Sequence, residues 1–191
     1  LLTIRAGSIS GDSSSVFIGD GLNVRSASGI QLNTLVADVL LAETSADMEA
    51  DGFASATAGQ LVLNESDALN LQRVVARDGG IEVTAGGDLL ARDVRSFVRG
   101  TVAADSQDIF LGSLGNLTVD RVETAVNLGS LKQAGDITLA ADEKIDVYRY
   151  STGDVNTGDA TTTNLYGYSV EIRGKLEQSL LVLEKNTTIE N

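Results

Sequence analysis

Charged side chains that could perform acid–base chemistry gather in one segment, "DLLARDVR", which begins at Asp88. Carboxylates such as Asp88 and Asp93, with cations such as Arg92 and Arg95, are the groups that polysaccharide lyases and pectin hydrolases place on one face of a β-sheet. However, Arg92, Asp93 and Arg95 also fit the outward positions of a strand, where a charged side chain is usually only solvated. We therefore predict no enzyme and no catalytic residue, and keep a polysaccharide lyase or hydrolase as the alternative.

Metal chemistry has few candidate ligands in this chain, which contains neither His nor Cys. Imidazole and thiolate ligands are thereby excluded, as are imidazole bases and cysteine nucleophiles. The sequence "DVNTGDA" places Asp154, Asn156 and Asp159 near the spacing of a calcium loop. An EF-hand would need a bidentate acid where Leu165 stands, so polar turn chemistry is the better interpretation. We predict no cofactor, with calcium as the weaker alternative.

Aromatic side chains that could bind a partner are concentrated in one stretch, because all four tyrosines lie between residues 148 and 168. An antiparallel hairpin centred near Gly158 would pair 148 with 168 and 150 with 166, with the four rings on one face. Residues 149–167 would then project as a hairpin or long loop. The candidate interaction surface comprises Tyr148, Arg149, Tyr150, Tyr166 and Tyr168, since Tyr and Arg are favoured at interfaces.

The overall charge narrows the range of partners. A net charge of −13 would repel phosphate backbones, so we expect no nucleic-acid partner. No run of about 18 apolar residues could span a bilayer, so no membrane span is expected. The acidic, Cys-free, Thr- and Ser-rich composition favours an extracellular or cell-surface location, where a host or cell-surface protein or a glycan could be the partner.

The elements that must position these groups are short strands that recur along the chain. Each repeat begins with two apolar residues separated by one position, and a further apolar residue follows eight positions after the first. These pairs are Leu61 and Leu63, Ile81 and Val83, Ile109 and Leu111, and Ile137 and Leu139. The later residues are Leu69, Leu89, Leu117 and Ile145. Period-two spacing predicts strands, and a repeat of 20 to 28 residues is typical of a solenoid.

The repeat predicts an all-β fold, a right-handed parallel β-helix (β-solenoid) of roughly seven coils, with residues 1–191 as a single segment of a longer chain. A β-sandwich binding module is the competing all-β architecture. One stretch, residues 34–58, is rich in Ala, Leu and Glu. We expect a helical or irregular excursion there.

The units "GGIEVTAGGDLLARDV" and "GDITLAADEKIDV" resemble the repeats of giant bacterial surface proteins, the filamentous-haemagglutinin-like adhesins. The resemblance covers residues 59–148. It implies a structural or adhesive rod of an extracellular or cell-surface protein. The family has no catalytic motif to transfer, so the resemblance assigns no active-site residue.

Both ends of the chain, "LLTIRAGSISG" and "SLLVLEKNTTIEN", also have strand-like patterns. Open strand edges at the two ends would favour association end to end, with neighbouring repeats or with a second copy, into a filament. A strongly acidic lateral surface would disfavour contacts side by side.

Overall fold

The computed structural model describes residues 1–12, 14–44, 59–77, 79–98, 108–127, 137–148, 150–151, 162–173, 176–177 and 180–190. Side chains are described as far as Tyr148, except those of 97–98 and 125–127. The described residues form strands and turns, with no helix among them. All strand pairings between them are parallel. The all-β prediction is confirmed, and the parallel pairing is consistent with a β-helix rather than with an antiparallel β-sandwich.

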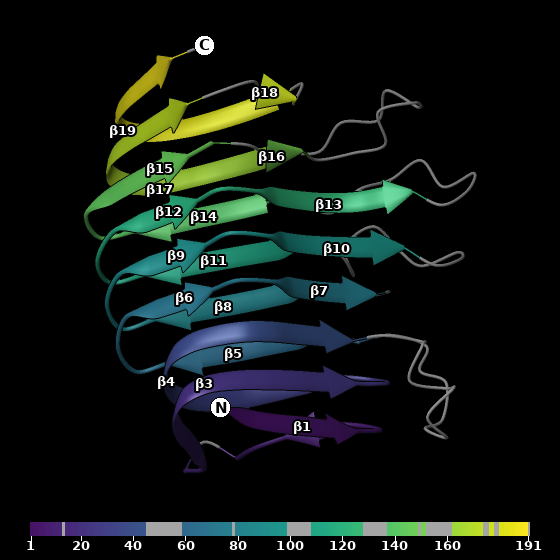
Figure 1. Ribbon diagram of the computed structural model, residues 1–191. Coiled ribbons are helices and arrows are strands. Elements are labelled where there is room, and N and C mark those ends of the chain that lie inside the picture. Colours follow the sequence, from purple (N-terminus) through teal and green to yellow (C-terminus); the bar gives the residue numbers. More distant parts are fainter. Residues whose placement is uncertain are drawn as a thin grey trace.

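The strands stack in three ladders, which we call A, B and C (Figure 1). Ladder A contains β2 (Ile9–Ser10), the first part of β4 (Ile30–Thr44), β5 (Leu61–Glu65), β8 (Ile81–Ala85), β11 (Ile109–Ser113), β14 (Ile137–Ala141), and the first parts of β17 (Thr162–Arg173) and β19 (Leu180–Glu190). Ladder B contains the first part of β3 (Val16–Ser26), the middle of β4, β6 (Leu69–Leu71), β9 (Leu89–Ala91), β12 (Leu117–Val119), β15 (Lys144–Val147), and the second parts of β17 and β19. Ladder C contains β1 (Leu2–Ala6), the last parts of β3 and β4, β7 (Val74–Arg77), β10 (Val94–Val98), β13 (Val122–Asn127), β16 (Tyr150–Ser151) and β18 (Leu176–Glu177).

Three consecutive strands, one from each ladder, form what we call a layer. The strands β8, β9 and β10 make one layer, which pairs with β5, β6 and β7 on one side. On the other side the same layer pairs with β11, β12 and β13. The layers follow one another from the N-terminus to the C-terminus along one axis (Figure 1).

The core consists of apolar columns that run through the layers, as the repeat predicted. In ladder A the register joins Leu61, Ile81, Ile109 and Ile137 in one column, and Leu63, Val83, Leu111 and Leu139 in another. In ladder B it joins Leu69, Leu89, Leu117 and Ile145. These twelve side chains are at most 2% exposed. A single layer cannot bury them, so the core exists only because layers stack.

The turns between ladders A and B are stacked as closely as the strands. The amide of Gly86 donates to the carbonyl of Glu65 at 3.0 Å. A Cβ atom at Gly86 would meet the backbone carbonyl oxygen of Ser66 in the preceding layer. Glycine is therefore required here by the close approach of two backbones.

A buried carboxylate organises the same corner. Glu65 is 5% exposed, and its Oε2 accepts hydrogen bonds from Thr34 Oγ1 at 2.8 Å and from the Val36 amide at 2.9 Å. Its Oε1 accepts from the Ser66 amide at 2.8 Å. The Ser66 amide also donates to the Thr34 carbonyl at 3.2 Å, so the carboxylate adds to the backbone bond that joins this turn to the neighbouring layer.

The helical or irregular excursion expected over residues 34–58 is wrong over residues 34–44, which belong to β4. Val39 and Ala42 are buried because they continue interior columns with Leu71 and Val74, and Val36 is buried in the same core. Pairing with strands on both sides outweighs the local helix propensity of this segment. The remainder of the stretch, residues 45–58, lies outside the described residues.

Candidate functional site

The tyrosines predicted to share one face are distributed over different ladders. Tyr150 pairs with Val122 in ladder C, whereas Tyr166 pairs with Ala140 in ladder A. Tyr148 follows β15, and its amide donates to the Val119 carbonyl at 2.9 Å. Its side chain is 42% exposed.

The antiparallel hairpin predicted for residues 149–167 is therefore wrong in its pairing. Strand β17 has β14 and β19 on its two edges in ladder A, both parallel, so neither edge is available for Tyr150. Arg149 and residues 152–161 lie outside the described residues. Whether Tyr148, Arg149, Tyr150, Tyr166 and Tyr168 contact a partner remains a prediction.

The four charged residues with possible acid–base chemistry are separated by the structure. Asp88 precedes β9, and its Oδ1 accepts hydrogen bonds from the Asn116 amide at 2.8 Å and from Asn116 Nδ2 at 3.1 Å. Arg92, Asp93 and Arg95 lie at the other end of β9 and in β10. A general acid and base acting on one substrate would have to converge, and Asp88 lies at the opposite end of β9 from the other three.

Arg92, Asp93 and Arg95 each take part in an ion pair. Arg95 Nη2 lies 2.6 Å from Asp93 Oδ2, and Arg92 Nη1 lies 3.2 Å from Asp120 Oδ2 in the next layer. Arg121 Nη2 lies 2.6 Å from Glu123 Oε2, which is on a side chain 5% exposed. The pair of Arg92 and Asp120 joins adjacent layers, whereas the other two pairs each lie within one layer.

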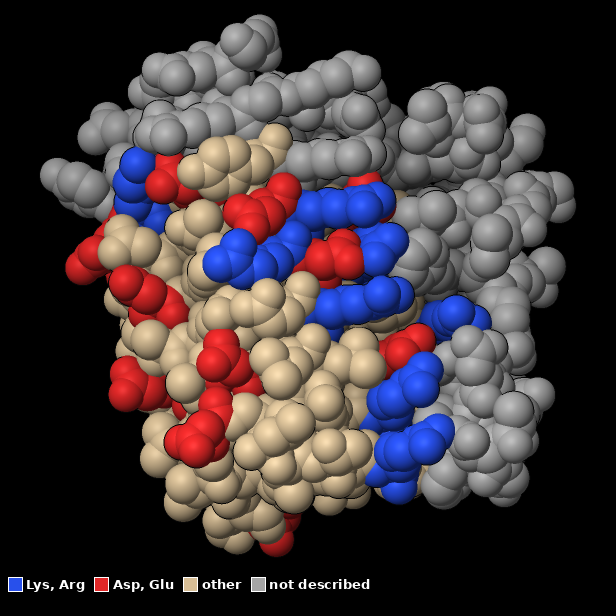
Figure 2. Space-filling model, in the orientation of Figure 1, with Lys and Arg blue, Asp and Glu red and all other residues tan. Residues whose placement is uncertain are grey.

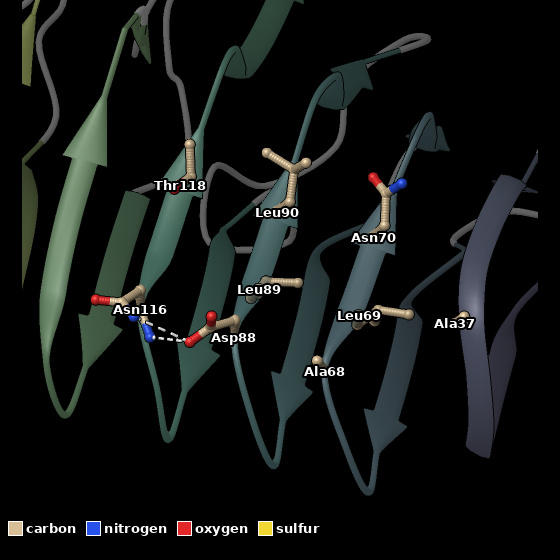
Figure 3. A pocket seen from close by; sticks show the side chains of 9 residues that line it. All are labelled: Ala37, Ala68, Leu69, Asn70, Asp88, Leu89, Leu90, Asn116 and Thr118. Carbon is tan, nitrogen blue, oxygen red and sulfur yellow. Dashed lines mark hydrogen bonds between the residues drawn. The ribbon is translucent and has the colours of Figure 1, made fainter.

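A groove of about 530 Å³ lies on the outer side of ladder B. It crosses four layers and is lined by Ala37, Ala68, Leu69, Asn70, Asp88, Leu89, Leu90, Asn116 and Thr118. Figure 3 shows Asn70, Leu90 and Thr118 standing on neighbouring strands, with Asp88 and Asn116 joined at one margin. The register places the first three side by side.

The groove can bind by hydrogen bonding and apolar contact. Asn70 Nδ2 donates to Asp38 Oδ1 at 2.7 Å, while Asn70 Oδ1 is buried and has no hydrogen-bond partner among the described residues. Leu90 and Ala68 supply apolar surface between the polar groups. Of the groove residues, the sequence pointed only to Asp88, as a candidate for acid–base chemistry. It gave no signal for Asn70 and Thr118, because only the register of ladder B brings them together.

Metal-binding geometry is absent from the described part of the chain, where no three acidic residues converge on one point. Asp154, Asn156 and Asp159, considered for calcium, lie outside it. An exposed acidic turn occurs at Asp12, whose Oδ1 accepts from Ser14 Oγ at 2.6 Å and Ser15 Oγ at 2.9 Å. The Ser14 hydroxyl, followed by that of Ser15, lowers the pKa of the Asp12 carboxyl below its usual value.

Comparison with known proteins finds no family model, no curated protein and no solved structure that matches this chain. Within the described residues there is no helix of the length and apolarity needed to cross a membrane.

Proposed function

We propose that this chain is a parallel β-solenoid segment that serves as a structural and adhesive rod of an extracellular or cell-surface protein. The observation that carries the proposal is the unbroken register of ladder A, in which β5, β8, β11 and β14 pair residue for residue. Such a stack grows only along its axis, because each new layer buries the apolar face of the previous one. The product of that growth is a rod.

The N-terminal end of the stack supports the end-to-end part of the proposal. Among the described residues, β1, β2 and residues 16–20 of β3 pair along one edge only. Ile4 is partly buried against the core, whereas Ile18 is 74% and Val16 46% exposed. An unpaired strand edge beside apolar side chains accepts a further parallel layer, from the same polypeptide or from a second copy.

The axial contact is tested with Ile18→Lys and a matched control, Leu114→Lys. Leu114 is 65% exposed but lies in the turn after β11, away from the N-terminal end. Electron microscopy and sedimentation should show wild-type rods that lengthen with concentration. Ile18→Lys should keep the rods single, because a buried, unpaired ammonium opposes the contact. Equal lengthening in both variants, or single wild-type rods at every concentration, would contradict axial association.

The adhesive part of the proposal is supported by the groove over ladder B, which presents amide, carboxylate and aliphatic groups together. A host or cell-surface protein, or a glycan, has the hydrogen-bonding groups to fill it. Glycan arrays and a reducing-sugar assay separate this role from catalysis. Binding without release of reducing ends is expected, while sugar release by the purified chain would replace the rod with a polysaccharide-processing enzyme.

A further inference from the structure

The groove over ladder B combines an aliphatic floor with a single charged group (Figure 3). Among the described residues, Asp88 is the one charged residue that lines it, whereas Ala68 and Leu90 supply aliphatic surface. Asp88 and Leu90 lie two positions apart in the chain, which separates the carboxylate from the leucine by about 7 Å along an extended strand. An occupant must therefore present an apolar part and a polar part about that far apart.

The backbone of ladder B is not available to the occupant, because the three strands under the groove are paired on both edges. Strand β6 lies between β4 and β9, β9 between β6 and β12, and β12 between β9 and β15. A partner segment cannot add to this part of the sheet as a further strand. Recognition in the groove must come from side chains.

The open polar atoms at the charged margin of the groove are acceptors. Asp88 Oδ1 accepts from the Asn116 amide at 2.8 Å and from Asn116 Nδ2 at 3.1 Å, while Asp88 Oδ2 has no partner among the described residues. Because Asn116 Nδ2 faces the carboxylate, Asn116 Oδ1 points away from it, and this oxygen also has no partner in the described part of the chain. The margin therefore favours an occupant that donates hydrogen bonds.

The charge around the groove is negative. Asp38 and Asp67 each adjoin in sequence an alanine that lines the groove. Among described side chains, Lys144 is the one cation in ladders A and B and the turns between them. It does not line the groove, and its Nζ lies 2.9 Å from Asp146 Oδ1. Figure 2 shows most Lys and Arg side chains in a band toward the right of the face, with Asp and Glu side chains over the left. A cationic occupant is attracted to such a surface, and an anionic one is repelled.

We infer that the groove binds a lysine side chain of a partner protein, with its methylene chain against Ala68 and Leu90 and its ammonium at Asp88 and Asn116. An ammonium carries three donors and no acceptor, which matches the acceptors at this margin. The aliphatic stem of lysine covers apolar surface, and its charged end neutralises the carboxylate, which a sugar hydroxyl cannot do. The inference rests on the adhesive role proposed for this groove, and it selects a protein rather than a glycan as the partner.

Saturation-transfer NMR tests the inference with two peptides, Ser-Gly-Lys-Gly-Ser and the same peptide with Nε-acetyl-lysine, both blocked at their ends. Acetylation keeps the methylene chain and removes the charge. With the wild-type chain, the lysine methylenes should receive the strongest saturation, and the acetylated peptide should bind about tenfold more weakly. The method observes the peptide, so it applies to single rods and to associated ones.

Asp88→Asn and Glu82→Gln are matched variants, because each removes one negative charge from an exposed residue. The amide in Asp88→Asn keeps an oxygen that can accept from the Asn116 amide, so the fold should be retained. Asp88→Asn should weaken binding of the lysine peptide about tenfold, whereas Glu82→Gln, on ladder A, should change it less than about twofold. Ala68→Leu fills the groove without changing charge and should abolish binding even if Asp88→Asn does not fold. Circular dichroism melts show whether each variant folds.

Equal weakening by Asp88→Asn and Glu82→Gln would overturn the inference in favour of a general attraction to an acidic rod. Equal binding of the two peptides, or no binding of the lysine peptide, would also overturn it. Saturation of a neutral oligosaccharide such as chitotetraose, lost in Ala68→Leu and without binding of the lysine peptide, would assign the groove to a glycan. That result would leave the adhesive role intact, whereas absence of binding to both peptide and glycans would contradict the adhesive role as well.

Discussion

At the scale of the residue, Ile109 is the most direct test of the interior columns. It is 1% exposed and lies between Ile81 and Ile137 in register. Ile109→Asp places an unpaired carboxylate among apolar side chains, which costs several kcal/mol and should prevent folding. Circular dichroism and thermal unfolding measure the result.

The control for this substitution is the next residue of the same strand. Phe110 is only partly buried and pairs with Glu82 and Thr138, which are not part of the buried core. Phe110→Asp should therefore keep a cooperative unfolding transition. A soluble, cooperatively melting Ile109→Asp protein would show that the columns do not carry the stability of the stack.

At the scale of the element, the turns determine how closely layers approach. Gly86, between β8 and β9, lies against the backbone of Ser66 in the turn between β5 and β6. Gly86→Ala should destabilise the protein by about 1–3 kcal/mol, because backbone atoms cannot move aside as a flexible side chain does. Gly19→Ala is the matched control, since a Cβ atom there meets nothing within 4 Å. Denaturant unfolding measures both variants. Equal unfolding midpoints would show that the close approach of the two backbones at Gly86 does not require glycine.

The turn at Glu65 shows how one polar side chain can add to the backbone hydrogen bonds that join neighbouring turns. The next residue in its column is Ala85, which cannot accept a hydrogen bond through its side chain. Both turns nevertheless use the same backbone bond, from the Ser66 amide to the Thr34 carbonyl at 3.2 Å and from the Gly86 amide to the Glu65 carbonyl at 3.0 Å. Equivalent turns in successive layers thus keep one backbone bond, while the side chain in the column changes from Glu65 to Ala85 to Ser113.

At the scale of the whole molecule, stability should vary along the axis. Central layers such as β8–β10 have neighbours on both sides, whereas β1 and β2 have one paired edge among the described residues. In a stacked architecture each layer is stabilised mainly by its neighbours, so opening is easiest at a terminal layer. Hydrogen exchange should be slow in peptides covering 81–95 and faster in peptides covering 2–10. Uniform exchange along the chain would indicate a single cooperative unit instead.

The sequence by itself determined the strands of the central layers and their inward residues. Alternation places Ile81 and Val83 on one face whatever their neighbours are, because successive strand side chains point to opposite sides. The distance of eight residues from the first apolar residue of each pair to the next one, as from Ile109 to Leu117, is the same in repeats of 20 and of 28 residues. These features are local, so the pattern within one repeat was sufficient to predict the strands and their inward residues.

Only the tertiary structure decided which distant residues share a surface. Helix propensity misassigned residues 34–44, because pairing on both strand edges outweighs a local preference. The tyrosine spacing suggested a hairpin, but Tyr150 and Tyr166 pair with earlier layers in ladders C and A. The groove at Asn70 arises from stacking side chains that lie 20 to 28 residues apart, and no pattern within one repeat carries information about that arrangement.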